Sequence, residues 1–483
     1  MLSIKKNLAY NFLLSLSQVL LPLVSIPYIS RILTPEGIGK VSFIDSFTYY
    51  FVSIAEFGIV VYGMREVARL RDDPPARDRA VSGLLSLHVL TSAISICLYS
   101  IAVFFLWQKI QDIRLLFFSF SFLLVNAFAC EWYFLGMERF RYIMLRSLIT
   151  RLLGLASLFL LVRAPEDYFL YYAIITGSAI VNGLWNSFYL FREVRISFRN
   201  IPWRRYAFQT RYTYAISLLA DVTLILDVVF LRLLSLPAAV GLYAFSMKIV
   251  RTSSSLLTDS LLVFFPRVVA LVRAEAYEEV KALVRRNIQL LLFFGIPMTL
   301  GIFVVAEPLV LVVLGPQFLP AVPNLQLLAF YLLLRVYNLF LSKQALIAHG
   351  QEKAYVKSLL LGAGIFVAAT IPLSWRYADL GACMAILLSE LATLLLNLYY
   401  CRRLVSYLPV WDNKSFLQAL AASLPFVLLA AGLNHWLQAP LPVLLTAIPL
   451  CAAVYILIQG WGFRNELAMN ARTTFTDYFL RRS

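Results

Sequence analysis

The sequence predicts an all-α polytopic membrane protein of about 14 transmembrane helices, with two six-helix lobes and two extra C-terminal helices. Three observations lead to this fold class: the apolar composition, the number of apolar runs long enough to cross a bilayer, and an internal repeat. Of the 483 residues, 61% are hydrophobic and only 14% are charged, and the mean hydropathy is +0.79. A soluble domain needs far less apolar surface, so these values exclude the soluble classes.

Apolar runs of about 20 residues, the length of a helix that crosses the membrane, recur along the whole chain. They fall near residues 8–31, 41–63, 81–106, 113–135, 147–163, 168–191, 212–234, 241–265, 287–313, 323–347, 358–375, 381–401, 415–436 and 442–462. The first run continues through Pro22 and Pro27 without a small-residue cleavage site, so we expect no cleavable signal peptide.

Basic residues gather in alternate connections between these runs. Roughly thirty lysines and arginines lie in one set of connections and about six in the other, which is a strong positive-inside signal. This bias predicts that both termini are cytoplasmic. It also accounts for the net charge of +16 without a nucleic-acid partner.

An internal repeat links the two halves of the chain. The run Arg31-Ile-Leu-Thr-Pro35-Glu-Gly-Ile-Gly39 returns as Arg232-Leu-Leu-Ser-Leu-Pro237-Ala-Ala-Val-Gly241, with one inserted residue. Two lobes related by rotation about the membrane normal are a common way to build a central pathway, so the repeat favours a transporter. It predicts an N-lobe over 1–211, a C-lobe over 212–403, and over 404–483 a C-terminal helix pair with a cytoplasmic tail.

Ionisable residues within the apolar runs are the candidate site residues, because such groups are costly in a membrane and usually face a bundle interior or an aqueous cavity. The cations are expected to line a central cavity and bind an anionic headgroup: Lys248, Arg251, Arg335, Lys343, Arg31 and Arg232. The carboxylates are candidates for coupling transport to an ion: Asp221, Asp227, Asp259, Glu56 and Asp45. A further carboxylate, Glu390, lies in the twelfth run.

The spacing of these charges is helical. Asp45 and Glu56 are eleven residues apart, and so are Lys248 and Asp259. Eleven residues span about three helical turns, so both members of each pair lie on one helix face. The arginines at 31 and 232 lie near helix ends, where snorkelling to the lipid headgroups is an equal alternative.

The sequence offers nothing for enzymatic chemistry. It has no glycine-rich phosphate loop and no histidine pair with metal-ligand spacing, and its five cysteines lie scattered in or beside apolar runs. We therefore predict no catalytic residue, no metal and no cofactor.

Two segments of the first hairpin carry a family resemblance. These are Pro27-Tyr28-Ile-Ser-Arg31-Ile-Leu-Thr-Pro35-Glu-Gly-Ile-Gly39 and Tyr62-Gly63-Met-Arg65-Glu66-Val-Ala68-Arg69, joined by Phe57-Gly58. With Trp132-Tyr-Phe-Leu-Gly136-Met-Glu138 and Gln344-Ala-Leu346, they resemble the polysaccharide-unit (O-antigen, Wzx-type) flippases of the multidrug/oligosaccharidyl-lipid/polysaccharide exporter superfamily.

This resemblance implies an inner-membrane carrier of undecaprenyl-pyrophosphate-linked oligosaccharides that works by alternating access. Membrane lipids and other polysaccharide assembly proteins would be its partners. Three alternatives stay open: a flippase of lipid II or another lipid-linked glycan, a multidrug antiporter of the same superfamily, and a membrane glycosyltransferase or O-unit polymerase. The last needs a large extramembrane domain or loop, and the sequence has neither.

Overall fold

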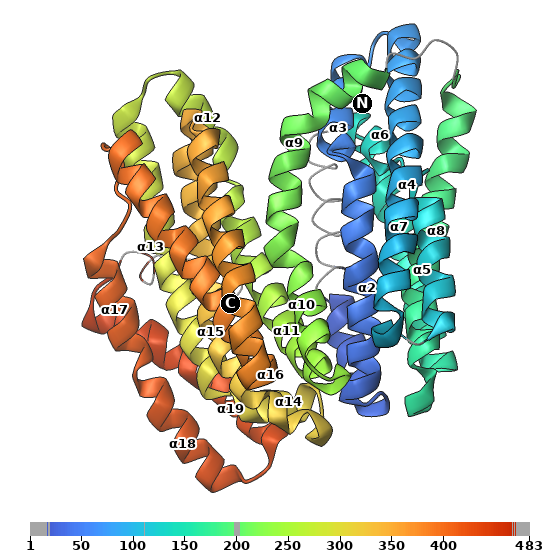
Figure 1. Ribbon diagram of the computed structural model, residues 1–483. Coiled ribbons are helices and arrows are strands. Elements are labelled where there is room, and N and C mark those ends of the chain that lie inside the picture. Colours follow the sequence, from blue (N-terminus) through green and yellow to red (C-terminus); the bar gives the residue numbers. More distant parts are fainter. Residues whose placement is uncertain are drawn as a thin grey trace, which may run out of the picture. The chain divides into compact units, whose positions relative to one another are not determined.

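The computed structural model describes residues 17, 20–110, 112–197, 203–465, 467 and 469, and within them the chain forms helices and no strands (Figure 1). Eight helices are long and apolar enough to cross a membrane, and a ninth span arises when a bent helix pair is counted as one. This confirms the all-α, polytopic fold class. Each predicted span coincides with a helix, with part of a long helix or with a broken helix pair. The first predicted span is described from Leu20 onward, and before Leu20 only Ser17 is among the described residues.

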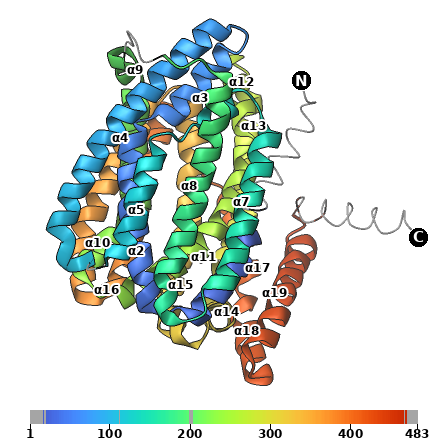
Figure 2. The same ribbon diagram turned by 90° about the vertical axis from the view of Figure 1, so that its right-hand side faces the viewer.

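The chain forms two compact units, residues 1–241 and 242–483. The helices of unit 1 begin with an apolar helix at Leu20–Ile32. They continue with α2 (Pro35–Glu56), α3 (Ile59–Arg69), α4 (Pro74–Ile110), α5 (Ile113–Asn126), α6 (Glu131–Gly136), α7 (Phe140–Leu161), η1 (Pro165–Asp167), α8 (Tyr168–Glu193), α9 (Trp203–Leu224) and α10 (Leu226–Leu234). Helices α5, α7 and α8 run alongside one another, α8 between the other two (Figure 2).

Helix α11 (Pro237–Leu262) begins at the end of unit 1 and runs into unit 2. Unit 2 continues with α12 (Phe265–Arg273), α13 (Tyr277–Val304), α14 (Ala306–Val313), η2 (Pro316–Ala321), α15 (Val322–Phe340), η3 (Leu341–Leu346), η4 (Ile347–His349), α16 (Glu352–Leu404), α17 (Asn413–Ser423), α18 (Pro425–Leu437), α19 (Pro440–Leu457) and η5 (Ile458–Gly462). The long α16 joins two predicted spans across Ala378, whose φ of 49° breaks the helical path.

Unit 1 is longer than the predicted N-lobe because α9 and α10 pack on it. Helix α9 contacts α2, α3 and α4, and α10 contacts α2. The predicted division at 211/212 and 403/404 follows the repeat rather than compactness, and it stays a prediction.

The second span breaks at two residues. Phe57 (φ 46°) and Gly58 (φ 71°) both have left-handed backbone conformations. The axis of α3 is bent by 41° from the axis of α2 at this point. At Gly58 the backbone of α9 comes so close that an added Cβ would lie 2.8 Å from the Tyr214 nitrogen. Glycine meets both demands, since it tolerates positive φ and allows close backbone approach. The break therefore lets α9 pack against the corner of span 2.

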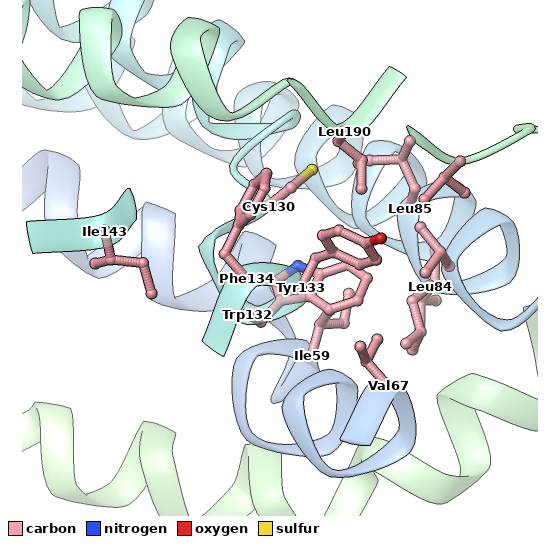
Figure 3. Packing of buried hydrophobic residues seen from close by; sticks show 13 residues of the cluster. Ile59, Val67, Leu84, Leu85, Cys130, Trp132, Tyr133, Phe134, Ile143 and Leu190 are labelled. Atoms are coloured by element: carbon pink, nitrogen blue, oxygen red, sulfur yellow. The ribbon is translucent and has the colours of Figure 1, made fainter. Parts of the chain in front are cut away.

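A hydrophobic core fixes one end of unit 1 (Figure 3). The short helix α6 inserts Trp132, Tyr133 and Phe134 among buried residues of α3, α4, α7 and α8. A Cβ on Gly63 would lie 2.6 Å from the Trp132 ring, and one on Gly136 would lie 2.7 Å from the Met64 carbonyl oxygen. Two of the segments that carry the family resemblance, residues 62–69 and 132–138, thus pack against each other.

Side-chain caps define several helix starts. Thr34 accepts a hydrogen bond from the Gly37 N–H at the start of α2 (3.3 Å), where Pro35 occupies the first helical position. Asp412 caps α17 by accepting bonds from the N–H of Ser415 (3.2 Å) and from the Gln289 amide of α13 (3.2 Å). Such caps are worth about 1 kcal/mol each.

The Asp412 cap predicts a pH dependence. Burial raises the pKa of Asp412, but the bonds from Ser415 and Gln289 outweigh it and bring that pKa below the ordinary value. A carboxyl with a lowered folded-state pKa stabilises the fold above the unfolded pKa of about 4, and this stabilisation disappears as the pH falls through the folded value. We expect α17 to loosen from α13 below about pH 4. Fluorescence of Trp411, which donates to Asn413 (2.6 Å), reports this change.

Asp412→Asn is the matched variant for this measurement. It should be less stable than the wild type at pH 7 and should lose the acid transition in Trp411 fluorescence. Asp167→Asn in unit 1 should keep the transition. An unchanged transition in Asp412→Asn would show that another group titrates.

Candidate functional site

A buried ion pair joins two helices of unit 2. The Arg335 Nη1 on α15 lies 3.1 Å from Glu390 Oε1 on α16, and the two side chains are 17% and 5% exposed. The amide of Asn338 donates to the other oxygen of Glu390 (2.7 Å) and to its backbone carbonyl (2.8 Å). The amide of Asn397 donates to Asn338 in turn (3.1 Å). A buried carboxylate with this many donors is well compensated.

Helix α11 brings two further cations toward this pair. Arg251 is close enough to Arg335 for their charges to interact, and Tyr331 on α15 forms a side-chain hydrogen bond with Arg251. Lys248 lies three residues earlier on the same face of α11 and is exposed, with its Nζ 5.9 Å from the centroid of the Phe245 ring. The structure thus groups three of the predicted cations in unit 2.

Lys343 lies on a different stretch of backbone. Residues Leu341–Leu346 form a π-helical turn, which changes the helical phase after Arg335. The turn is anchored by Gln344, which donates to the Leu261 carbonyl of α11 (3.0 Å) and accepts from Asn287 of α13 (2.7 Å). In the described part of the chain no hydrogen bond or ion pair joins Lys343 to Arg335 or Glu390.

Three predicted carboxylates gather along α2 in unit 1. Ser53 donates a hydrogen bond to Asp221 of α9, and Glu56 lies within electrostatic range of Asp221. The ring hydroxyl of Tyr49 interacts with both Asp45 and Glu56, which confirms that the eleven-residue spacing places these two carboxylates on one face. The structure therefore brings Glu56 and Asp221 together beside the break in span 2, with Asp45 on the same face of α2 about three turns away.

The remaining predicted residues lie apart from these groups. Arg232 donates to the backbone carbonyls of Ser235 (3.2 Å) and Lys109 (2.8 Å), so it ties helix ends together. Arg31 is exposed and donates to the Pro27 carbonyl of its own helix (3.3 Å). Asp227 is fully buried and accepts from the Val228 N–H (2.9 Å), whereas Asp259 is exposed near the end of α11.

The two copies of the repeated motif meet within unit 1. A Cβ on Gly39 would lie 1.7 Å from the carbonyl oxygen of Pro237, and a Cβ on Gly241 would lie 1.9 Å from the carbonyl oxygen of Pro35. The contact is reciprocal, because each glycine receives the proline carbonyl of the other copy. Exchange of equivalent partners is the mark of two-fold related segments.

Sequence reasoning missed several polar residues of these networks. Asn338 and Asn397 are neutral, so they are not among the predicted ionisable residues. Their spacing gave a usable signal, since Asn338 follows Arg335 by three residues and Asn397 follows Glu390 by seven. Arg146, which is not among the predicted site residues, is 2% exposed and pairs with Glu131 (2.5 Å) and Asn186 in unit 1.

Comparisons with known proteins find a matching family and similar proteins. A family model described as polysaccharide biosynthesis protein matches residues 4–272. A protein of Escherichia coli strain K12 named "Putative O-antigen transporter" is 24% identical over 416 residues, which cover 83% of this chain and 97% of that protein. A Shigella dysenteriae protein of the same name is 25% identical over 405 residues, which cover 82% and 99%.

Two solved structures share the fold. The lipid II flippase MurJ in an inward closed conformation superposes with a TM-score of 0.72 at 13% identity, covering 95% of this chain and all of that one. An inward-facing multidrug transporter of the MATE family and MOP superfamily gives a TM-score of 0.60 at 13% identity, covering 80% and 94%. At this identity the likeness concerns the fold alone.

Proposed function

Because the chain belongs to the polysaccharide biosynthesis protein family, we propose that it is a flippase for undecaprenyl-pyrophosphate-linked oligosaccharide units. It would move them from the cytoplasmic to the outer leaflet of a bacterial inner membrane by alternating access. The observation that carries this proposal is the match to two O-antigen transporters over 97% and 99% of their lengths. Flipping makes and breaks no covalent bond, so we propose no enzymatic activity.

The cations of unit 2 suit the pyrophosphate of such a substrate. Arginine binds phosphate oxygens through two parallel hydrogen bonds, and lysine adds a mobile point charge. Glu390 already holds Arg335, which leaves Lys248 and Arg251 on α11 as the groups that contact the headgroup. Arg335 then acts as a positioning residue, because its charge and the Tyr331 hydroxyl of the same helix together determine where the Arg251 side chain lies.

The carboxylates of unit 1 suit a coupling role. Glu56 and Asp221 are near neighbours, and a pair of this kind can take up and release a single proton. They lie where α2 breaks at Phe57–Gly58, so a change in their charge acts directly on the packing between α2 and α9. We propose that this pair, rather than Asp227 or Asp259, couples transport to a proton gradient.

The charge distribution supports an orientation with both termini in the cytoplasm. Membrane lipids surround the protein and the lipid-linked glycan is its substrate, while other polysaccharide assembly proteins are proposed partners. This orientation places Leu236 on the outer side and Arg205 on the inner side. Accessibility labelling of single cysteines at these two positions in intact cells tests it.

A double variant of the α11 cations tests the substrate site. Lys248→Ala/Arg251→Ala removes two charged donors whose bonds are worth about 1.5–3 kcal/mol each. We therefore expect transport to fall at least tenfold in a strain that lacks its own O-antigen flippase. The measurement is the amount of polymerised surface glycan at equal membrane levels of protein. Arg376→Ala, which removes an exposed arginine beside Tyr377, is the matched control and should transport normally.

The same assay separates the alternatives. Wild-type levels of surface glycan from the double variant would remove α11 from the proposed site. Rescue of a lipid II flippase mutant, without rescue of the O-antigen strain, would assign the chain to the lipid II alternative. Glycan transfer by purified protein in the absence of lipid movement would support the glycosyltransferase alternative instead.

A further inference from the structure

A polar cavity of about 900 Å³ opens in unit 1 beside the hydrophobic core of Figure 3. Its walls come from the end of α3, the start of α4, the segment after α8 and the start of α9. Five arginines line it: Arg69, Arg77, Arg79, Arg195 and Arg205. The charge pattern of the sequence assigns this end of unit 1 to the cytoplasm.

The carboxylates of the cavity are already engaged. Glu66 pairs with Arg69 at 2.6 Å. Asp78 lies 3.4 Å from Arg77 and accepts from the Arg195 N–H (3.2 Å). Glu193 forms an ion pair with Arg139, which lies outside the cavity, and accepts a hydrogen bond from the Tyr133 hydroxyl (3.1 Å). Five arginines and three carboxylates leave two positive charges in excess.

That excess is carried by accessible side chains. Arg79, Arg195 and Arg205 are exposed, and in the described part of the chain none of them forms an ion pair with a carboxylate. Arg77 is held more tightly, with its guanidinium 6.0 Å from the centroid of the Tyr133 ring. Its Nε is buried and has no hydrogen-bond partner among the described residues. The cavity therefore offers free guanidinium donors from three separate chain segments.

The walls of the cavity are rigid enough to hold these donors in place. Tyr206, on the same turn of α9 as Arg205, packs against the core, as does Ile196, next to Arg195. Gly83 of α4 receives the Tyr206 ring so closely that an added Cβ would lie 2.2 Å from it. Ser82 accepts a hydrogen bond from the Ser197 N–H (3.1 Å), which fixes the segment after α8 on α4.

From this cavity we infer a second anion site, which binds a doubly charged phosphate group at the cytoplasmic end of unit 1. Guanidinium forks match phosphate oxygens in geometry, and two excess charges match a phosphomonoester or diphosphate dianion. A carboxylate ligand would carry half that charge and fewer acceptor oxygens. The inference is independent of the proposed flippase activity, since it concerns different residues in a different unit.

Two sources can supply this chemistry: a soluble phosphate compound from the cytoplasm, or the headgroup of an anionic lipid in the inner leaflet. Inorganic pyrophosphate is the probe for the first, measured by isothermal titration calorimetry on purified protein in a neutral detergent. Phosphatidylcholine nanodiscs with or without phosphatidic acid, a phosphomonoester lipid, are the probe for the second and are compared by thermal unfolding. The test variant is Arg79→Gln/Arg205→Gln, which removes two side chains that form no ion pair with any described residue and should fold normally.

The soluble source predicts pyrophosphate binding that persists in Lys248→Ala/Arg251→Ala, is weakened by added salt and is at least tenfold weaker in Arg79→Gln/Arg205→Gln. The lipid source predicts no pyrophosphate binding that depends on Arg79 and Arg205. It predicts a higher Tm in nanodiscs that contain phosphatidic acid than in phosphatidylcholine alone, a difference that the double variant loses. Arg192→Gln, on the same end of unit 1 but outside the cavity, should match the wild type in both arms. Arg79→Lys/Arg205→Lys keeps the charge and should retain part of the effect.

Two outcomes would overturn the site. One is a wild type that neither binds pyrophosphate nor distinguishes the two lipids. The other is an Arg79→Gln/Arg205→Gln variant that keeps the full pyrophosphate binding, or the full lipid-dependent difference in Tm, that the wild type shows.

Discussion

Replacing Glu390 with alanine is expected to destabilise unit 2 by about 3–5 kcal/mol and to abolish transport. Glu390 is the acceptor for Arg335 and for Asn338, and all three side chains are buried or nearly so. Without Glu390, Arg335 keeps its positive charge in an apolar bundle with no counter-charge. An uncompensated buried charge is the main reason why breaking a buried ion pair destabilises a fold. Thermal unfolding of the purified variant and surface glycan in the transport assay measure the two effects.

The variant Arg335→Leu/Glu390→Leu is the informative control. Removing both charges together avoids the uncompensated arginine, so stability should return to within about 1–2 kcal/mol of the wild type. Transport should stay low, because the proposed function needs the charge of Arg335 to position Arg251. Normal transport by Arg335→Leu/Glu390→Leu would mean that this ion pair stabilises the fold but is not needed for transport. A Glu390→Ala variant as stable as the wild type would contradict the buried pair itself.

The second large effect is expected at the reciprocal glycines. In Gly39→Leu the new Cβ would fall 1.7 Å from the carbonyl oxygen of Pro237, and in Gly241→Leu it would fall 1.9 Å from that of Pro35. Both obstacles are backbone atoms, so side-chain rotation cannot relieve them, and we expect about 3 kcal/mol or more of strain from overpacking. Either variant should lose surface glycan in the transport assay and should unfold at lower temperature.

The chain offers matched glycines for this test. Gly177 in α8 and Gly364 in α16 are helical, and an added Cβ at either would meet no atom within 4 Å. Gly177→Ala and Gly364→Ala should keep full transport and gain up to about 1 kcal/mol, since alanine restricts the unfolded chain. Normal transport by both Gly39→Leu and Gly241→Leu would mean that this contact is not required during the cycle.

The sequence predicted the spans well because hydropathy is an average over about 20 residues and tolerates local error. It did not predict the places where helices change direction. The left-handed residue Ala378 and the π turn at Leu341–Leu346 depend on single backbone angles and on tertiary bonds such as that of Gln344 to Leu261. No composition signal marks either of them.

The sequence predicted which ionisable residues lie within the membrane helices, but it did not predict which of them pair with one another. Arg335 was chosen because an ionisable group in an apolar run is costly, and the structure adds that Glu390 compensates it from the next helix. Arg232 fits the same rule, yet it bonds backbone carbonyls at a helix end. Pairing depends on which helices are neighbours, and a single sequence does not contain that information. The roles of all these residues in transport stay predictions.

The packing of α6 under α3 bears on how relatives of this chain can be told apart. Gly63 packs against Trp132, and Gly136 packs against Met64 and Val67, so the residues that carry the family resemblance contact α3 and α6 themselves. A sequence signature of this kind identifies the fold and gives no information about the transported substrate. If the proposed substrate site is the one that acts, sugar preference is set by the side chains around the cations of α11 and α15. Classification of new members by glycan therefore calls for a comparison of those helices rather than of the signature.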